Sequence, residues 1–407
     1  MRSLSIKTKL VASVVFCLVA GGLVTAWAID RSSRRSLDLL TEQSIRNAIA
    51  SFNNLERGDV RMLDATIQAL LASDSLRLPF AAKDRPTLLA RSTPQYDQFK
   101  RAFGITNWNY LDLDSTNFLR MTEPAVFGDK ITRYNVAQCL SKRSVSSGLG
   151  LGNHGFALRV AEPVFDTGKP DGKLAGCLEL GTEVGRFLED MKQQTGDEFG
   201  MTIRKDKLEE AKWAKSRAFL KQRNNWADQP AVVLAKNTLD DQALFAVGDS
   251  IDSVPETGRN LRLLETGSTV YSRGVFPLHD ASGGRVGLLV VLHDVTQVYR
   301  EMKTTMRLAG LTIAGLTVLL SLALIVVIER LVFRRLDQIT RTAKRVVGGD
   351  YTTAIVPSTQ DEIGSFESLF DQFRVVFVNV VQEVEARNRL DGEGSAASRQ
   401  QEDRSGE

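Results

Sequence analysis

Arginine side chains on neighbouring expected strands are the residues of this chain best suited to binding chemistry. In "FLRMT" side chains alternate between two faces, so Phe118, Arg120 and Thr122 share one face. Arg159 lies on the strand expected in "FALRVAEPVFD", and Glu179 on the strand expected in "KLAGCLELG". A guanidinium binds a carboxylate through two parallel hydrogen bonds. Arg120 and Arg159 are therefore predicted to converge on the carboxylate of a small ligand.

Some of these residues have a structural alternative. An ion pair between Arg159 and Glu179 would fix the sheet instead of binding a ligand. Trp108 would form an aromatic wall of the site together with Tyr110, or it would pack in the core. The full set of candidate ligand-binding residues is Arg120, Thr122, Arg159, Tyr110, Trp108, Arg133, Tyr134 and Glu179.

Catalysis, metal binding and nucleic-acid binding find no support in the sequence. The three histidines, His154, His279 and His293, lack metal-ligand spacing, and no nucleophile is spaced to pair with a base. A formal net charge of +3 provides no strongly basic surface for nucleic acid. We therefore expect neither an enzyme nor a cofactor.

The stretch "GLGNHG", residues 150–155, spells the G-x-G-x-x-G of a dinucleotide-binding turn. It follows "SKRSVSS", which is not a buried strand, and it leads into a strand rather than a helix. No helix N-terminus is therefore placed to hold a pyrophosphate. We expect these glycines to shape a loop over the front of a sheet.

Two apolar runs are long enough to cross a membrane. Residues 10–29 and 308–328 contain no charged side chain, and a span needs roughly 20 helical residues. Basic side chains are dense directly after the second run, which places that side in the cytoplasm. Residues 30–306 are then extracytoplasmic, although three arginines after the first run oppose this orientation. We expect the first run to be retained; the alternative is cleavage at its "AWA" stretch.

Two cysteines fall in the extracytoplasmic segment, where the compartment is oxidising. Cys139 and Cys177 are candidates for one disulfide. The alternative is that each serves as an unpaired small apolar residue. Cys17 falls in the first apolar run.

The elements that must position the candidate residues form a repeat. Residues 31–78 predict one long helix, and "WNYLDLDSTNFLRM" predicts a β-hairpin. "GKLAGCLELGTEVGRFLEDM" at residues 172–191 aligns without gaps on "GGRVGLLVVLHDVTQVYREM" at residues 283–302. Upstream, "PVFD" and "PLHD" align after a three-residue shift. We infer two copies of one α+β module.

This segment resembles the double-Cache sensory domains of bacterial transmembrane receptors. "FLRMTEPAVFGD" is similar to that family's F-L-R-x-x-x-P-x-x-x-G-D segment, and "GNHGFALRVAEPVFD" and "GKLAGCLELG" are similar to two others. Thr122 stands where the family often has His. The resemblance implies an α+β fold in which a long N-terminal helix carries two stacked Cache (PAS-like) modules with antiparallel sheets. It also implies a small extracytoplasmic ligand.

The residues after the second run resemble a HAMP domain, a parallel four-helix dimer that relays signals below receptor spans. Two apolar seams with spacings of three and four, residues 336–346 and 363–384, are joined by a connector. One copy supplies two of the four helices, so the resemblance implies a homodimer with a helical coiled coil. Arg335 replaces the family's usual proline; the alternative is an amphipathic helix pair lying on the lipid. The candidate signalling residues are Gly349, Asp350, Asp361, Glu362, Ile363, Gly364, Phe366, Phe370, Phe373 and Phe377.

These patterns together predict a two-pass sensor of the bacterial inner membrane with its sensor domain in the periplasm. The histidines all lie in the extracytoplasmic segment, so we expect ligand binding to be relayed through HAMP to a separate kinase, cyclase or receptor array. The alternative is a non-signalling ligand-binding scaffold, or a receptor without its output domain. The expected boundaries are 1–9 (cytoplasmic), 10–29 (first span), 30–78 (long helix), 79–195 (membrane-distal module), 196–306 (membrane-proximal module), 308–328 (second span), 329–386 (HAMP and signalling helix) and 387–407 (disordered tail).

Overall fold

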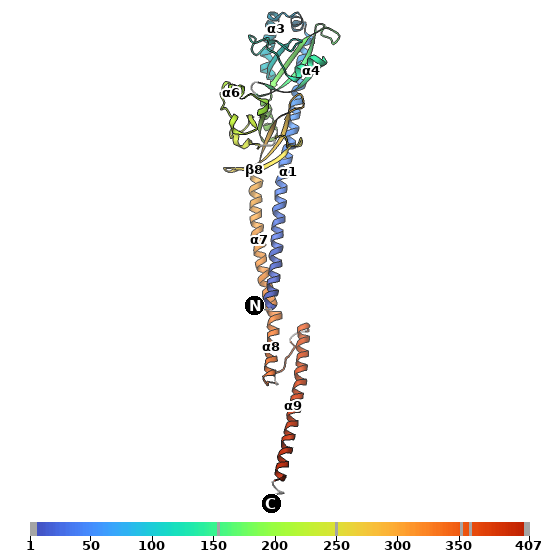
Figure 1. Ribbon diagram of the computed structural model, residues 1–407, viewed down its shortest axis with the longest axis vertical. Helices are drawn as coiled ribbons and strands as arrows, with labels where there is room; N and C mark the ends of the chain where they lie inside the picture. The colour runs from blue at the N-terminus through green and yellow to red at the C-terminus, as the bar shows by residue number, and fades with distance from the viewer. Residues whose placement is uncertain (1–5, 153–154, 249–250, 351–352, 358–359, 403–407) are drawn as a thin grey trace. The chain divides into compact units, whose positions relative to one another are not determined.

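A computed structural model describes residues 6–152, 155–248, 251–350, 353–357 and 360–402 of the protein. Internal contacts divide the chain into two units, which are treated separately below. One unit is Arg31–Lys303, and the other combines Met1–Asp30 with Thr304–Glu407. The fold class is the predicted α+β, with two antiparallel sheets and several long helices (Figure 1).

The chain begins with the long helix α1 (Ile6–Ala72). The sequence predicted a helix to residue 78, and this end is wrong. At Ser73 the backbone is extended, and its hydroxyl caps α2 (Asp74–Ala81) by accepting a hydrogen bond from the Ser75 amide. A third helix, α3 (Arg85–Phe103), follows and carries proline in its first turn, where no amide donor is needed.

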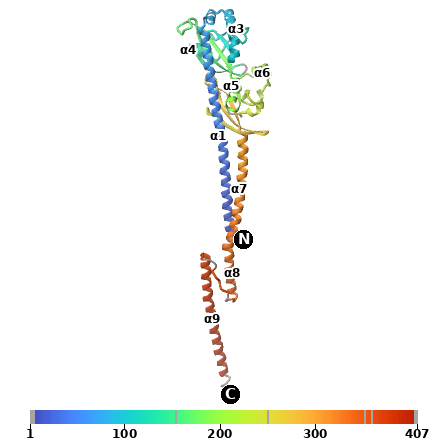
Figure 2. The same cartoon turned by 180° about the vertical axis from the view of Figure 1, so that it is seen from behind.

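The first module contains a five-stranded sheet with the order β2-β1-β5-β4-β3. Helices α1, α2 and α3 pack on one face of this sheet, and α4 (Tyr134–Lys142) packs on the other face. Figure 2 shows α3 and α4 near the C-terminal end of α1. The predicted hairpin is confirmed as β1 and β2, and the two later strands as β4 and β5. The strands are β1 (Ile105–Leu111), β2 (Asn117–Arg120), β3 (Ser146–Gly152), β4 (Gly155–Phe165) and β5 (Leu174–Glu183).

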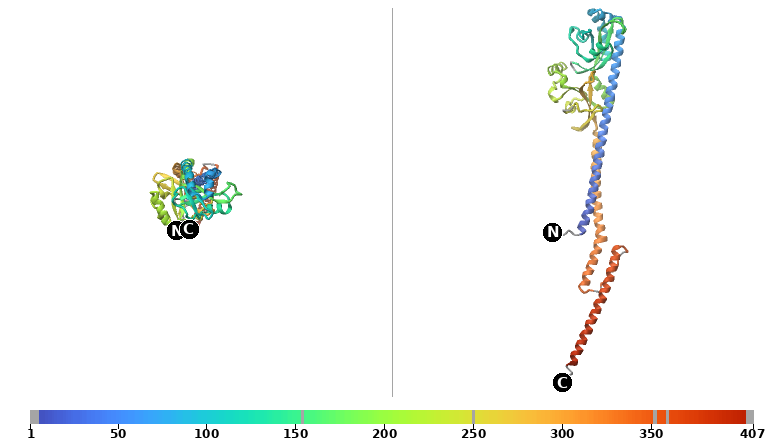
Figure 3. Two further views of the ribbon diagram at one scale, coloured as in Figure 1. Left: turned by 90° about the horizontal axis from the view of Figure 1, so that it is seen from above. Right: turned by 45° about the vertical axis from the view of Figure 1, so that its right-hand side comes forward.

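The second module repeats this topology with the order β7-β6-β10-β9-β8. Its central strand β10 starts 111 positions after β5, the offset of the sequence repeat, which the structure therefore confirms. Both modules lie along the same side of α1 (Figure 3). The elements are α5 (Gly185–Thr195), β6 (Glu198–Arg204), α6 (Glu210–Phe219), β7 (Val232–Asn237), β8 (Arg259–Thr266), β9 (Thr269–His279) and β10 (Arg285–Asp294), with short 3-10 turns at Lys205–Lys207, Trp226–Asp228 and Gln242–Phe245.

Two glycines that match in the repeat share one physical role. A Cβ at Gly176 would lie 2.2 Å from the carbonyl oxygen of Leu111, and one at Gly287 would lie 1.9 Å from that of Thr202. Both distances are far inside van der Waals contact. Each module therefore needs glycine where the neighbouring strand approaches its central strand.

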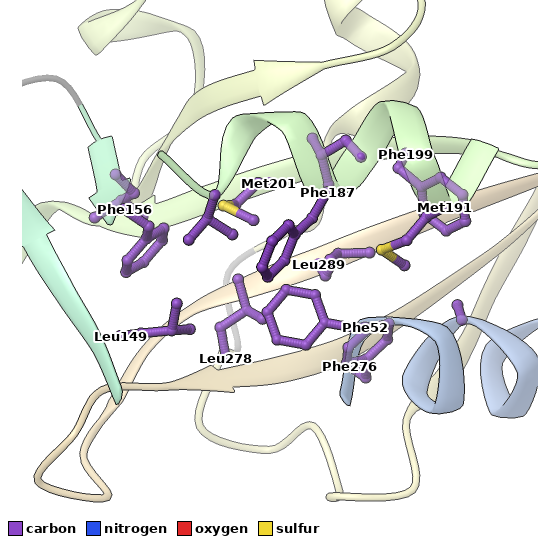
Figure 4. Close-up of a cluster of buried hydrophobic side chains, with 14 of the residues drawn as sticks. Phe52, Leu149, Phe156, Phe187, Met191, Phe199, Met201, Phe276, Leu278 and Leu289 are labelled. Atoms are coloured by element: carbon purple, nitrogen blue, oxygen red, sulfur yellow. The ribbon is translucent and has the colours of Figure 1, made fainter. Parts of the chain in front are cut away.

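One apolar core joins the two modules. Phe52 of α1 packs edge-on against Phe187 of α5 and Phe276 of β9, with ring centroids 5.9 and 6.4 Å away (Figure 4). Leu149 and Phe156 of the first sheet belong to the same buried cluster. The two sheets are therefore held by shared packing as well as by the covalent connection through α5.

The other unit contains two helical segments that are long and apolar enough to cross a membrane, in α1 and in α7 (Thr296–Ile328). A Cβ at Gly22 would lie 3.1 Å from the side chain of Ile313, so glycine allows these segments to approach closely. After α7 the backbone makes a π-helical turn at Glu329–Phe333 and continues as α8 (Arg334–Val347).

A connector then leads to α9 (Glu362–Glu402). Asp361 caps this helix by accepting a hydrogen bond from the Gly364 amide at 2.8 Å, which accounts for the D-E-I-G pattern. Arg335, in place of proline, binds Asp361 at 3.0 Å. The prediction of a disordered tail from residue 387 is contradicted, because the described backbone is helical to Glu402. Extending an existing helix requires no new nucleus, and "AASRQQE" consists mostly of good helix formers.

Candidate ligand-binding site

A cavity of about 430 Å³ lies on the α4 side of the first sheet. Its floor comes from β1 and β4, and its rim comes from the end of β2, the start of α4 and the C-terminus of α6 in the second module. Four of the predicted residues line it: Arg120, Thr122, Arg133 and Arg159. The remaining lining residues are Tyr96, Lys100, Thr106, Asn107, Asn109, Glu123, Leu151, Ala157, Glu183 and Phe219.

Glu179 lies beneath this cavity and is fully buried. Arg133 donates to both of its carboxylate oxygens, with Nε 3.0 Å from Oε1 and Nη2 bound to Oε2. The amide of Asn109 donates to Oε2 at 2.9 Å, and Nη1 of Arg159 lies 3.4 Å from it. Burial alone would raise the pKa of Glu179, but the charges of Arg133 and Arg159 outweigh it, so this pKa lies below its ordinary value. The carboxylate therefore stays ionised and fixes two arginines under the cavity.

Arg159 is only 4% exposed, and its side chain lies flat across the sheet. A Cβ at Gly181 would lie 3.1 Å from its Cγ, and one at Gly150 would lie 3.5 Å from its Cδ. Its Nε is buried and has no hydrogen-bond partner among the described residues. Burial lowers the pKa of this guanidinium. Arg159 thus combines the predicted structural pairing with Glu179 and a position at the cavity wall.

The glycine-rich stretch has a different role from the one predicted. Residues 146–152 form the edge strand β3, paired with β4, and not a loop over the sheet. Gly150 leaves room for Arg159 on the neighbouring strand. Asn153 and His154 lie outside the described residues. A Cβ at Gly148 would instead lie 2.8 Å from Ala281 of the second module, so these two glycines leave room for different neighbours.

Arg120 and Thr122 stand at the rim of the cavity. Nη2 of Arg120 lies 2.7 Å from the carboxylate of Asp129. Asp129 is partly exposed, whereas Glu179, the carboxylate partner of Arg133, is fully buried. Arg120 therefore lines the cavity while it is paired with a carboxylate that water also reaches.

Besides Glu179, three predicted residues fall outside the cavity. Trp108 and Tyr110 are buried on the opposite face of the sheet, where the Tyr110 hydroxyl bonds Ser92 at 3.0 Å, so the aromatic wall is wrong. Tyr134 begins α4 and is 44% exposed. Alternation along β1 instead points Asn107 and Asn109 at the cavity. Alternation along β1 would have indicated Asn107 and Asn109 only once Trp108 was assigned to the core.

Cys139 of α4 and Cys177 of β5 are both free and fully buried. They pack with Leu111, Val136 and Ala161 between α4 and the sheet. Burial raises the pKa of Cys177, so its thiol stays protonated. The disulfide prediction is therefore contradicted, and the alternative of two small apolar side chains holds.

The equivalent face of the second module is closed. Asn109 pairs with Glu179 between the central strands of the first sheet, and Gly200 pairs with Val290 at the matching place in the second. A Cβ at Gly200 would lie 2.3 Å from the ring of Phe245, which covers this position. The polar floor of the first module is thus replaced by an aromatic plug.

The second module also has an arginine at the position that matches Arg159, but the N–H donors of this arginine have hydrogen-bond partners. Arg273 of β9 occupies the place that Arg159 has in β4. Its Nη1 donates to the carbonyl oxygens of Leu244 and Ala246, on either side of Phe245. Arg273 therefore holds the plug in place, whereas Arg159 keeps an unused donor.

A separate cavity of about 640 Å³ lies beside β7 in the second module. Several of its charged and amide groups are bound to one another or to the backbone. Arg223 binds Asp228 at 2.9 Å, and the Asn225 amide donates to the Leu234 carbonyl at 2.7 Å. Among the described residues, the first module therefore has the cavity with an unused buried donor.

Residues 43–299 match the family described as "Double sensory domain of two-component sensor kinase" (dCache_3). The chain belongs to this double sensory (Cache) domain family. The match covers α1 from residue 43, both sheets and the start of α7, and it agrees with the resemblance inferred from the sequence. No curated protein sequence matches the chain.

Solved structures similar to this chain are sensor domains of chemoreceptors and histidine kinases. The ligand-binding domain of the Campylobacter jejuni chemoreceptor Tlp3 in complex with L-valine is 8% identical, with a TM-score of 0.38, over 66% of this chain and 97% of that one. The periplasmic domain of Vibrio cholerae LuxQ is 10% identical, with a TM-score of 0.35, over 62% and 99%. The sensor domain of the V. cholerae histidine kinase DctB is 14% identical, with a TM-score of 0.35, over 61% and 96%.

Proposed function

We propose that this chain is a two-pass sensor of the bacterial inner membrane that binds a small carboxylate ligand in its first, membrane-distal module. The observation that carries the proposal is Arg159. Its guanidinium lines the cavity, is almost wholly buried and keeps one donor without a partner. An unpaired buried donor costs free energy, so a ligand that accepts from it gains this energy on binding.

The cavity supports a carboxylate with further polar groups. Arg120 stands at the rim, and the amides of Asn107 and Asn109 offer both donors and acceptors. Arg133 is already committed to Glu179, so it contributes positive potential more than free donors. Glu123 and Glu183 at the wall suit an amino group or a hydroxyl on the same ligand.

Contacts at the base of the second module support a route toward the second span. Leu37 of α1, Val270 of β9 and Val295 at the head of α7 form one buried cluster. The Val295 amide also donates to the Val270 carbonyl at 2.9 Å. A change in packing between the modules would therefore reach α7 through the second sheet.

The cytoplasmic helices support a HAMP relay in a homodimer. Phe366, Phe373 and Phe377 on one seam of α9 are 49, 66 and 42% exposed in the single chain. Such a seam is costly to leave in water, and a second copy would cover it. The relay would end at a cytoplasmic output protein that recognises the state of this coiled coil.

The test is thermal unfolding of the full chain in lipid nanodiscs with carboxylates, amino acids, amines and purines. A ligand at about one hundredfold over its Kd adds roughly 2.7 kcal/mol to stability. We expect a carboxylate to raise Tm, Arg120→Ala to remove the rise, and Arg186→Ala to keep it. Arg186 binds Asp59 and does not line the cavity, so it controls for loss of a surface cation. A rise that survives in Arg120→Ala, or the absence of any rise with carboxylates, would contradict the proposal.

A further inference from the structure

A second polar site lies on the opposite face of the first sheet, where α1 packs on β4. Glu162 of β4 is 6% exposed and stands between Val160 and Val164, which belong to the apolar core. Its carboxyl group faces that of Asp64, which lies on α1 beside Leu63. A buried acidic side chain, Glu162, therefore meets a half-buried one, Asp64, at an apolar helix–sheet interface.

The hydrogen bonds at this interface leave one oxygen of each carboxyl group unsatisfied. Gln68 donates to Oδ2 of Asp64 at 3.3 Å. Oδ1 of Asp64 and Oε1 of Glu162 are both buried and have no partner among the described residues. Ionised carboxylates only accept hydrogen bonds, so two of them in contact repel each other. A proton held between the two groups satisfies both oxygens at once.

We propose that Glu162 binds a proton against the carboxyl group of Asp64 and so forms a proton-binding site, so that extracytoplasmic pH is a second input of this sensor. The site is separate from the cavity, because Glu162 and Arg159 point to opposite faces of β4. Loss of the proton leaves two negative charges between α1 and the sheet. The repulsion then weakens the packing of α1, the helix that also provides the first apolar span.

The electrostatic surroundings agree with this geometry. Burial, followed by the hydrogen bond and charge of Asp64, raises the pKa of Glu162 to about 8, while the Gln68 amide opposes the shift. Arg77 of α2, which also packs on β4, is held by Asp74 and by the Asp166 carbonyl. On the far face of the sheet Arg133 and Arg159 are bound to Glu179, and the Cys177 thiol is neutral. The proton is therefore released in mildly alkaline solution.

Infrared difference spectroscopy of the full chain in nanodiscs tests the site directly. Between pH 7 and pH 9, roughly one unit below and above the raised pKa of Glu162, we expect wild type to lose one protonated-carboxyl C=O band. We expect Glu162→Gln to lack this band, because glutamine imitates the neutral acid in shape and should fold. Asp64→Asn, which removes the other carboxyl group of the pair, is the second variant. Glu189→Gln on α5 is the control and should keep the band.

Thermal unfolding supplies a second readout. The Tm of wild type should fall between pH 6 and pH 9. The Tm of Glu162→Gln should fall less over this range, and the Tm of Glu189→Gln should fall as much as that of wild type. A wild-type spectrum without the band, or a band that persists in folded Glu162→Gln and in Asp64→Asn, would overturn the proposal. Neither measurement needs the carboxylate ligand, so this test is independent of the proposed function.

Discussion

Nε of Arg133 lies 3.0 Å from Oε1 of Glu179, and the two residues join the start of α4 to the central strand β5. Arg159 approaches the same carboxylate from β4. Because Glu179 is fully buried, its charge compensates the buried guanidinium of Arg159 as well as the partly exposed guanidinium of Arg133.

Glu179→Gln should therefore destabilise the protein strongly. Removing one partner of a buried ion pair costs about 3–5 kcal/mol, since the remaining charge has no compensation. Glu123→Gln, at the cavity rim, is the matched control and should change the free energy of unfolding little. Urea unfolding at pH 7 measures both values. Equal stability of the two variants would mean that the Arg–Glu–Arg arrangement does not hold α4 on the sheet.

Gly181→Ala and Gly150→Ala should differ sharply, although both glycines lie beside Arg159. At Gly181 the new Cβ would stand 2.9 Å from the Leu158 carbonyl and 3.1 Å from Arg159, whereas at Gly150 the nearest atom is 3.5 Å away. Overpacking costs about 1–3 kcal/mol, and ordinary contact costs little. We expect a lower Tm and a weaker carboxylate response for Gly181→Ala alone. Matching Tm values would show that Arg159 moves freely out of this position.

His293 of β10 should make stability depend on pH near neutrality. Its Nδ1 lies 2.7 Å from Asp197, and this hydrogen bond raises the pKa of His293 above 6.5. A histidine whose pKa is raised by folding contributes stability that is complete below its unfolded pKa and is lost as pH rises through its folded pKa. The gap in Tm between wild type and His293→Asn should therefore be wider at pH 5.5 than at pH 8.5. A constant gap would indicate that the pair acts through an uncharged hydrogen bond.

Phe377→Glu should separate ligand binding from output. A carboxylate in the exposed seam of α9 disfavours a coiled coil with a second copy, whereas the first module is untouched. We expect the ligand-induced rise in Tm to remain while the response of the output protein is lost. Asn379→Glu adds the same charge off the seam and should keep both. Loss of ligand binding in Phe377→Glu would refute this division.

The repeat and the strands could be predicted from the sequence because their causes are local. Gly176 and Gly287 match because each meets a neighbouring carbonyl, and β4 and β5 alternate in a regular way. Which face of β1 turns toward the core was not predicted, because an aromatic residue such as Trp108 can pack in a core or line a pocket. The contact of Asp64 with Glu162 joins residues far apart in the chain, so no local pattern indicates it.

Two other predictions, the disulfide and the end of the long helix, were wrong for a physical reason. Whether Cys139 and Cys177 are oxidised depends on how α4 sits on the sheet, which composition does not determine. The break of the long helix at Ser73 depends on one hydroxyl that caps the next helix in preference to continuing the first. Both are decided by tertiary context.

The apolar cluster around Phe52, Phe187 and Phe276 limits how this architecture can be recombined. Leu149 and Phe156 from the first sheet complete that cluster. A chimera that replaces one module alone would therefore expose apolar side chains at the junction of the two modules. Exchange between relatives should succeed when both sheets move together with the stretch of α1 that lies against them. The two modules and the part of α1 that packs against them therefore form one unit that can be exchanged only as a whole.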